Sequence, residues 1–200
     1  MKLLGKSNKW VRLGSMEITK KLYVKNRQAW RKWLKENHDK KNEIWLIYYK
    51  KSSGKPRIPY NDAVEEALCF GWIDGIEKGI DHERFAQRFT PRRPRSNLSA
   101  TNVERIRRLI LQKKMTKFGL RAISHAFDQK PKPFIIPAYL LKEFKRNKKI
   151  WSNFQRFPES YKRIRVGWID ASRKRPDIYK KRLEYFLKKT EKNEKFGMVQ

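Results

Sequence analysis

The residues that could carry chemistry gather in one stretch of the chain, residues 70–102. Three arginines, Arg88, Arg92 and Arg93, lie close together within it. A guanidinium group presents a planar fork of N–H donors that fits the oxygens of phosphate, sulfate and carboxylate groups. The sequence therefore predicts an anion-binding pocket built around these arginines.

Small polar residues follow the arginines and would complete the same pocket. Ser96, Ser99 and Asn102 surround the start of a predicted helix, whose first turn has free backbone N–H groups and the positive end of a dipole. Trp72 and Asp74, which come earlier in the stretch, are predicted to support the pocket. The expected ligand is a phosphate, a carboxylate or a sulfated group.

Two other interpretations of these residues stay open. In a purely structural one, Arg88 pairs with Asp74 across adjacent strands, while the serines and Asn102 only cap a helix. In an enzymatic one, Asp74 or Glu77 acts as a general base beside arginines that hold an anionic substrate. Neither a second matched carboxylate nor an activated nucleophile accompanies them in the sequence, so we predict no catalytic residues.

Cysteine and histidine usage predicts neither a metal site nor a cofactor. Cys69 is the single cysteine, and the three histidines are scattered along the chain, which excludes the usual zinc spacings and an intramolecular disulfide. Because Cys69 ends an apolar helical segment, we expect a buried thiol and not a nucleophile. With no apolar stretch suited to a signal peptide or a membrane span, we expect a cytoplasmic protein.

The charge balance is strongly basic. Lys and Arg total 51 against 20 Asp and Glu, which gives a net charge of +31. Such a surface attracts polyanions, so nucleic acid or an anionic envelope component is a candidate partner. Nonspecific, salt-dependent nucleic-acid binding is an alternative function, with Tyr48, Tyr49 and Trp72 as stacking surfaces. A lysine-rich composition bias would also produce this charge.

The first part of the chain predicts an α+β fold, with an antiparallel sheet and helices on one side of it. The predicted elements are a helix capped by Asn26 and ending near Asn37, a strand over 43–50, a helix from Pro59 to Gly71, and strands over 72–80 and 83–90. The strands follow from runs of β-branched and aromatic residues, and the helix ends from capping residues.

The loop that contains Arg92, Arg93 and Arg95, here called the arginine loop, leads into a helix whose first residues predict where it begins. Thr101 and Glu104 have the spacing of a capping box, with Ser99 as an alternative cap. Apolar residues of this helix would face the core. The residues expected to face outward are Arg105, Arg107 and Arg108.

We predict two domains after a flexible lead-in. Three prolines within residues 128–137 make this segment the clearest linker in the chain. The predicted parts are the lead-in at 1–17, an α+β domain at 18–130 and a small all-helical domain at 131–200. The tetrapeptide Gly-Trp-Ile-Asp occurs twice, at 71–74 in a predicted strand and at 167–170 in a predicted helix, so we do not interpret it as a repeat.

Taken together, these residues resemble the YdeI/OmpD-associated proteins, also described as bacteriocin-protection proteins. The matching motifs are the helix with Trp30, Trp33 and Leu34, the run from Ala67 to Gly75, the run from Arg88 to Pro94 with Ser96, Ser99 and Asn102, and Pro158, Trp168 and Arg182 in the helical part. The chain departs from the family at Leu98, where a Trp is usual, and at Ile178 and Tyr179, where a Thr-Arg pair is usual.

The resemblance spans most of the chain and implies a role in resistance to bacteriocins, cationic peptides or envelope stress. It implies the small helical domain as well. It supplies no established reaction and no catalytic residue set, so a non-enzymatic protein is the expectation.

Overall fold

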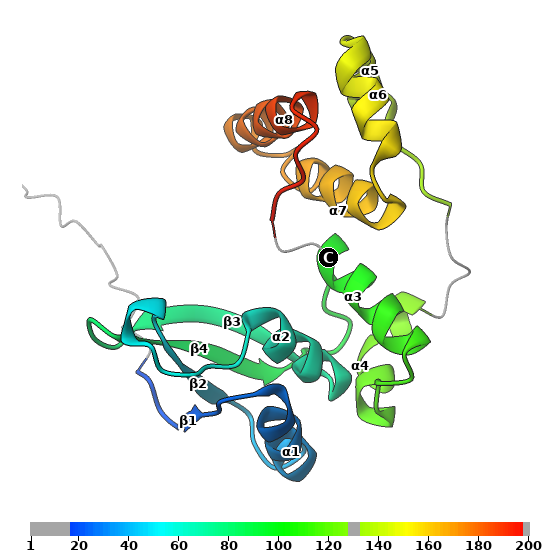
Figure 1. The fold of residues 1–200 in the computed structure, drawn as a ribbon. Coiled ribbons are helices and arrows are strands. Elements are labelled where there is room, and N and C mark those ends of the chain that lie inside the picture. Colours follow the sequence, from blue (N-terminus) through cyan, green and yellow to red (C-terminus); the bar gives the residue numbers. More distant parts are fainter. Residues whose placement is uncertain (1–16, 128–132, 198–200) are drawn as a thin grey trace, which may run out of the picture.

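The computed structural model describes residues 17–127 and 133–197 (Figure 1). Its first part is built on a four-stranded sheet in the order β1-β2-β4-β3. The strands are β1 (Lys21–Tyr23), β2 (Ile44–Tyr49), β3 (Trp72–Gly79) and β4 (Arg84–Pro91). Because β2, β4 and β3 pair antiparallel, as predicted, and helices dominate the second part, the α+β fold class is confirmed.

The edge strand β1 is absent from the sequence-based prediction. It has three residues and pairs with β2 in parallel, so one edge of the sheet carries a parallel pair. A strand this short gives no hydrophobic alternation that could distinguish it from a loop. Its position therefore depends on β2, to which it is hydrogen bonded.

Four helices share one core with one face of the sheet. They are α1 (Arg27–Asn37), α2 (Tyr60–Cys69), α3 (Ala100–Leu111) and α4 (Lys117–Phe127). Of these, α2 packs on the sheet, and α1, α3 and α4 pack on α2. The Asn26 side chain caps α1 by accepting a hydrogen bond from the Ala29 backbone N–H at 2.9 Å. Gly71 follows the end of α2 with a φ of +77°, a conformation that favours glycine.

The main core lies between the sheet and these helices. Trp30 and Leu34 of α1 and Phe89 of β4 are fully buried there. Adjacent strand residues point to opposite faces, so Trp45 and Ala86 belong to a smaller cluster on the other side of the sheet. The helix-covered face therefore holds most of the apolar burial.

The start of α3 uses the alternative of the two predicted caps. Ser99 is the cap, accepting from the Asn102 backbone N–H at 3.2 Å, and Thr101 lies inside the helix. Arg105 and Arg108 do not face outward, because both reach toward α2. Their long side chains bring the guanidinium groups to polar atoms beside the apolar stripe.

A buried ion network joins α1, α2 and α3. Glu65 and Glu66 have side chains only 8% and 3% exposed. Arg27 contacts both carboxylates, at 3.1 Å and 2.5 Å, Arg31 binds Glu66 at 2.6 Å, and Arg108 binds Glu65. A buried carboxylate without such partners would cost several kcal/mol, about 3–5 when one partner of a buried pair is removed.

The second part of the structure is helical, as predicted. Its elements are α5 (Ala138–Lys145), α6 (Lys148–Arg156), α7 (Glu159–Asp170) and α8 (Pro176–Glu191). Phe144, Phe154 and Phe186 form the aromatic centre of its core. The second Gly-Trp-Ile-Asp lies at the end of α7 and the first at the start of β3, so the two copies have different structures.

Helices α3 and α7 bring the two parts of the structure together (Figure 1). A Cβ on Gly167 would lie 2.8 Å from that of Ala100, so glycine permits this close approach. A cavity of about 1020 Å³ opens beside the contact and is mainly apolar. The predicted lead-in up to residue 16 and the linker residues 128–132 lie outside the described residues, so the domain limits stay predictions.

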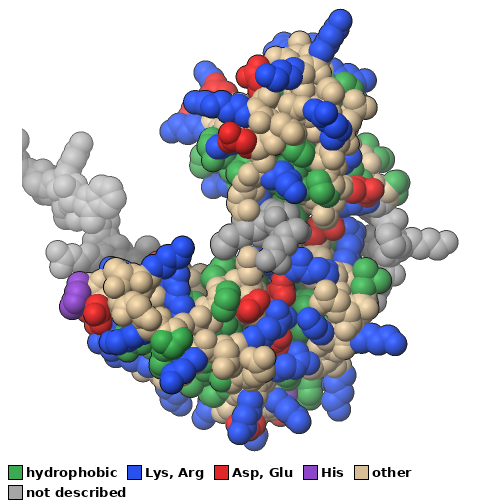
Figure 2. Space-filling view, in the orientation of Figure 1, with side chains coloured by type: hydrophobic (Ala, Val, Ile, Leu, Met, Phe, Trp, Pro, Cys, Tyr) green, Lys and Arg blue, Asp and Glu red, His purple; other side chains and the backbone are tan. Residues whose placement is uncertain are grey.

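Within the described ranges, no helix is both long and apolar enough to cross a membrane. On the face shown in Figure 2, lysine and arginine side chains are spread over both parts of the structure. This distribution agrees with the sequence, in which residues 131–200 carry 20 basic and seven acidic residues.

We expect Gly119→Ala to destabilise the protein by about 1–3 kcal/mol, because an added methyl group would be overpacked. A Cβ on Gly119 would lie 2.3 Å from the carbonyl oxygen of Cys69, which is backbone and cannot rotate away. Gly79→Ala is the matched control, since its Cβ would meet nothing within 4 Å. Urea unfolding measures both, and equal midpoints for the two variants would contradict the prediction.

Candidate functional site

Arg88 lies on the sheet face opposite the helices. It is paired in register with Trp45, whereas Asp74 is paired with Phe89 of the main core. Arg88 binds Glu43, with Nε 2.7 Å from Oε2. The proposed pairing of Arg88 with Asp74 is therefore wrong, because the two side chains point to opposite faces.

Asp74 lies in a polar cluster at the start of α2 and α3. It accepts a hydrogen bond from the Tyr60 hydroxyl at 2.5 Å. Burial, and then the bond to Asp74, raise the pKa of Tyr60. Nearby, Arg105 donates to the side-chain oxygens of Asn102, at 2.9 Å, and Asn61, at 2.6 Å. Asn102 is thus used in holding Arg105, whose pKa is lowered by burial.

Arg92 and Ser96 are brought together, as predicted. The Nη2 group of Arg92 donates to the hydroxyl and carbonyl oxygens of Ser96, at 3.0 and 3.2 Å, and to the Asn97 carbonyl at 3.0 Å. Its Nε is buried and has no hydrogen-bond partner among the described residues. Burial lowers the pKa of Arg92, with Asp74 acting against that shift.

The remaining predicted residues divide between the surface and the core. Arg93 is exposed beside Arg92, and Ser99 only caps α3. Trp72 is 1% exposed, with its indole N–H donated to the carbonyl oxygen of His38 at 3.0 Å. Trp72 is therefore no stacking surface, and neither is Tyr48, which is 2% exposed.

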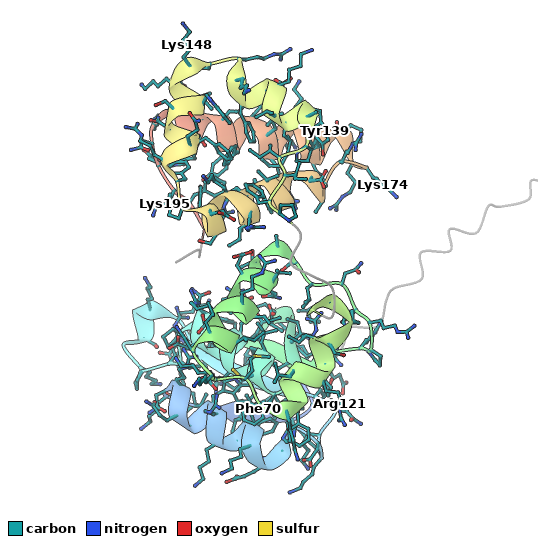
Figure 3. All side chains as sticks on the ribbon, turned by 90° about the vertical axis from the view of Figure 1, so that its right-hand side faces the viewer. Phe70, Arg121, Tyr139, Lys148, Lys174 and Lys195 are labelled. Atoms are coloured by element: carbon teal, nitrogen blue, oxygen red, sulfur yellow. The ribbon has the colours of Figure 1, made fainter. Side chains whose placement is uncertain are left out.

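A groove beside Arg92 is lined by further cations that were not part of the predicted anion site. We call it the Arg92 groove; its volume is about 690 Å³. Its ionisable lining residues are His38, Asp39, Arg92, Arg95, Arg121 and His125. They come from the end of α1, the arginine loop and α4, and Figure 3 shows Arg121 close to Phe70, another lining residue.

Two histidines, His38 and His125, line the Arg92 groove. His38 Nδ1 lies 3.0 Å from the Leu34 carbonyl oxygen and therefore carries the proton of the neutral ring. Its Nε2 is buried with no partner in the described ranges. His125 donates from Nε2 to the Ser96 carbonyl at 3.1 Å, so the Arg92 loop and α4 are joined directly.

The groove has an excess of positive charge. It contains three arginines and one carboxylate, that of Asp39. No ion pair within the described parts of the chain joins Arg92, Arg95 or Arg121 to a carboxylate. Arg121 instead lies 6.0 Å from the centre of the Phe118 ring. This arrangement suits a small anion, which would offset the repulsion between the arginines.

Sequence reasoning missed His38, Arg121 and His125 because they lie far from Arg92 along the chain. Gly119 is a sequence signal that could have indicated this packing. It lets α4 contact the end of α2, because a Cβ at this position would overlap the Cys69 carbonyl. Thr116 reinforces this contact by donating its hydroxyl to the same oxygen at 2.6 Å. The part of the chain that is described contains no group of three or more His, Cys, Asp or Glu that could hold a metal ion.

Comparisons with known families divide the chain in two. Residues 22–122 match the model of a family described as Domain of unknown function (DUF8412). Residues 133–193 match the model described as Bacteriocin-protection, YdeI or OmpD-Associated, which confirms the resemblance for the helical part, whereas the motifs before residue 122 lie in the other match. No curated protein and no solved structure was found that matches the chain.

We expect Cys69 to resist thiol reagents in the folded protein. Its side chain is fully buried, and burial, with Glu66 acting in the same direction, raises its pKa to about 11. At pH 8 the thiol is therefore protonated, and labelling should be at least about a hundredfold slower than for an exposed cysteine. Absorbance with a disulfide reagent follows the reaction, with urea-unfolded protein as the control; rapid native labelling would contradict the assignment.

Proposed function

The chain belongs to the family described as Domain of unknown function (DUF8412), and its residues 133–193 match the YdeI/OmpD-associated model, so we propose that it is a protective protein that binds a small anion in the Arg92 groove. The proposed ligand carries a phosphate, sulfate or carboxylate group. The protective role comes from the family description, and the anion from the chemistry of the groove. The cytoplasmic location expected from the sequence stays a prediction.

The anion proposal rests on two nitrogen atoms that have no hydrogen-bond partner within the described ranges and belong to residues lining a basic groove. Arg92 Nε and His38 Nε2 are buried without partners among the described residues, and both side chains line the same cavity. Buried polar groups of this kind usually have a partner, so their exceptions call for an explanation. An anion in the groove would accept from Arg92.

The same ligand would use His38 in either protonation state. The neutral ring has a free acceptor at Nε2, which fits the O–H of a hydrogen phosphate, while the protonated ring donates to an anionic oxygen. Arg121 and Arg95, which also line the groove, would supply the remaining positive charge. The site differs from the sequence-based one, since Arg88 lies on the other face of the sheet.

We expect inorganic phosphate or sulfate to raise the melting temperature of the protein and Arg121→Gln to remove most of that effect. At about 100 times the dissociation constant, a ligand adds about 2.7 kcal/mol, or about 5–10 °C for a chain of this size. Sodium chloride at equal ionic strength controls for screening.

Arg93→Gln is the matched variant in this experiment. It removes the same charge from an exposed residue next to Arg92 that does not line the groove. If Arg93→Gln and Arg121→Gln lose the anion effect equally, or if neither anion stabilises the wild type, binding in the groove is excluded. Arg92 itself is a poorer target, because it also holds the loop at Ser96.

The protective role has its own test in cells. A strain lacking the protein would be complemented with the wild type, Arg93→Gln or Arg121→Gln and challenged with a bacteriocin or a cationic peptide. We expect the first two to restore survival and Arg121→Gln to restore less, measured as colony counts. Equal survival with all three would show that protection does not depend on the Arg92 groove. If the wild type does not restore survival, the proposed protective role is wrong.

A further inference from the structure

The strongest basic cluster outside the Arg92 groove lies where α7 turns into α8. We call it the basic turn and define it by six cations in ten residues. They are Arg173, Lys174, Arg175, Lys180, Lys181 and Arg182. Asp177 is the single acidic residue within this span. Figure 3 shows Lys174 projecting from the helical part, near Tyr139 and away from Lys148.

The cations of the basic turn have no carboxylate partner in the part of the chain that the structure describes. Among the described residues, none of the six takes part in an ion pair. Six arginines of the first part, by contrast, are paired with glutamate or aspartate. Five of the six cations of the basic turn are exposed, which leaves their charge available to an external anion.

Two arginines of the basic turn are held in place by aromatic rings. The Arg173 guanidinium lies 4.6 Å from the centre of the Tyr139 ring, and that of Arg182 lies 4.8 Å from Trp168. Arg182 also donates from Nη1 to the Trp168 carbonyl at 2.5 Å. Burial and the neighbouring Arg175 both lower the pKa of Arg182, as expected of like charges held together. Preorganised cations lose less side-chain entropy on binding.

We propose that the basic turn binds the phosphate backbone of nucleic acid. The cluster extends over several cations, so it matches a chain of phosphates better than a single anion. Contacts of this kind position a protein on the backbone without reading base sequence, which agrees with the absence of an exposed stacking surface at Trp72 and Tyr48. The proposal does not depend on the Arg92 groove.

An anionic membrane would offer the same phosphate chemistry but a different surface. Interfacial binding sites combine cations with several large apolar side chains that enter the lipid. Tyr139 and Trp168 lie against the guanidinium groups of Arg173 and Arg182, so Ile178, which is 36% exposed, is the one large apolar side chain that residues 173–182 expose. These features favour nucleic acid as the partner.

The test compares two triple variants of equal charge. Arg173→Gln/Lys174→Gln/Arg175→Gln alters the basic turn, and Lys145→Gln/Lys148→Gln/Lys149→Gln alters exposed lysines at the α5–α6 turn. Fluorescence anisotropy with a 20-base-pair DNA duplex would be measured between about 50 and 200 mM salt. We expect the first variant to lower the slope of log affinity against log salt by about 2–3 and to weaken binding about tenfold or more, and the second to change both much less.

Further variants keep the result interpretable. Lys174→Glu, at one exposed position, should weaken binding even if the triple variant fails to fold, whereas Arg173→Lys/Arg175→Lys should retain the slope. Equal loss in both triple variants would show a general charge effect and overturn the proposal, as would no loss in either. Binding to vesicles containing anionic lipid that depends on the basic turn, with DNA binding unchanged, would identify a membrane surface instead.

Discussion

Burial of two neighbouring carboxylates on α2 is the constraint on which the first part of the structure depends. Glu65 and Glu66 cannot remain charged inside the protein unless cations surround them, and Arg27, Arg31 and Arg108 do so from α1 and α3. The network therefore fixes how these helices lie against one another. It also ties arginines from two helices to buried carboxylates, although their own side chains stay partly exposed.

Acidic residues are scarce in this chain, so their placement decides which cations are structural and which are free. Where a carboxylate is present, as at Glu43 beside Arg88, the arginine is tied to the fold. Arg121 of the Arg92 groove and Arg173 of the basic turn lie outside the ion pairs of the described residues and are backed by aromatic rings. At both proposed binding surfaces, several cations therefore have no carboxylate partner among the described residues.

The sequence predicted the fold well and the site only in part. Local signals sufficed for α1, with its Asn26 cap, and for the antiparallel pair of β3 and β4. They did not suffice for β1, which has too few residues for a pattern, or for Arg88, whose face depends on strand register. Arg92 and Ser96 could be grouped because they are only four positions apart in the sequence, whereas His38 and Arg121 meet Arg92 only through tertiary packing.

The close contact between α4 and the end of α2 has a consequence for how this groove could change in evolution. At Gly119 no side chain separates the helix from the Cys69 carbonyl, so main-chain atoms set the distance between two walls of the Arg92 groove. Smaller core residues cannot narrow such a spacing, because main-chain atoms are already in contact. Homologous proteins that keep this glycine would therefore share the same closest approach of these walls and diversify their ligands through the side chains at positions such as 95, 121 and 125.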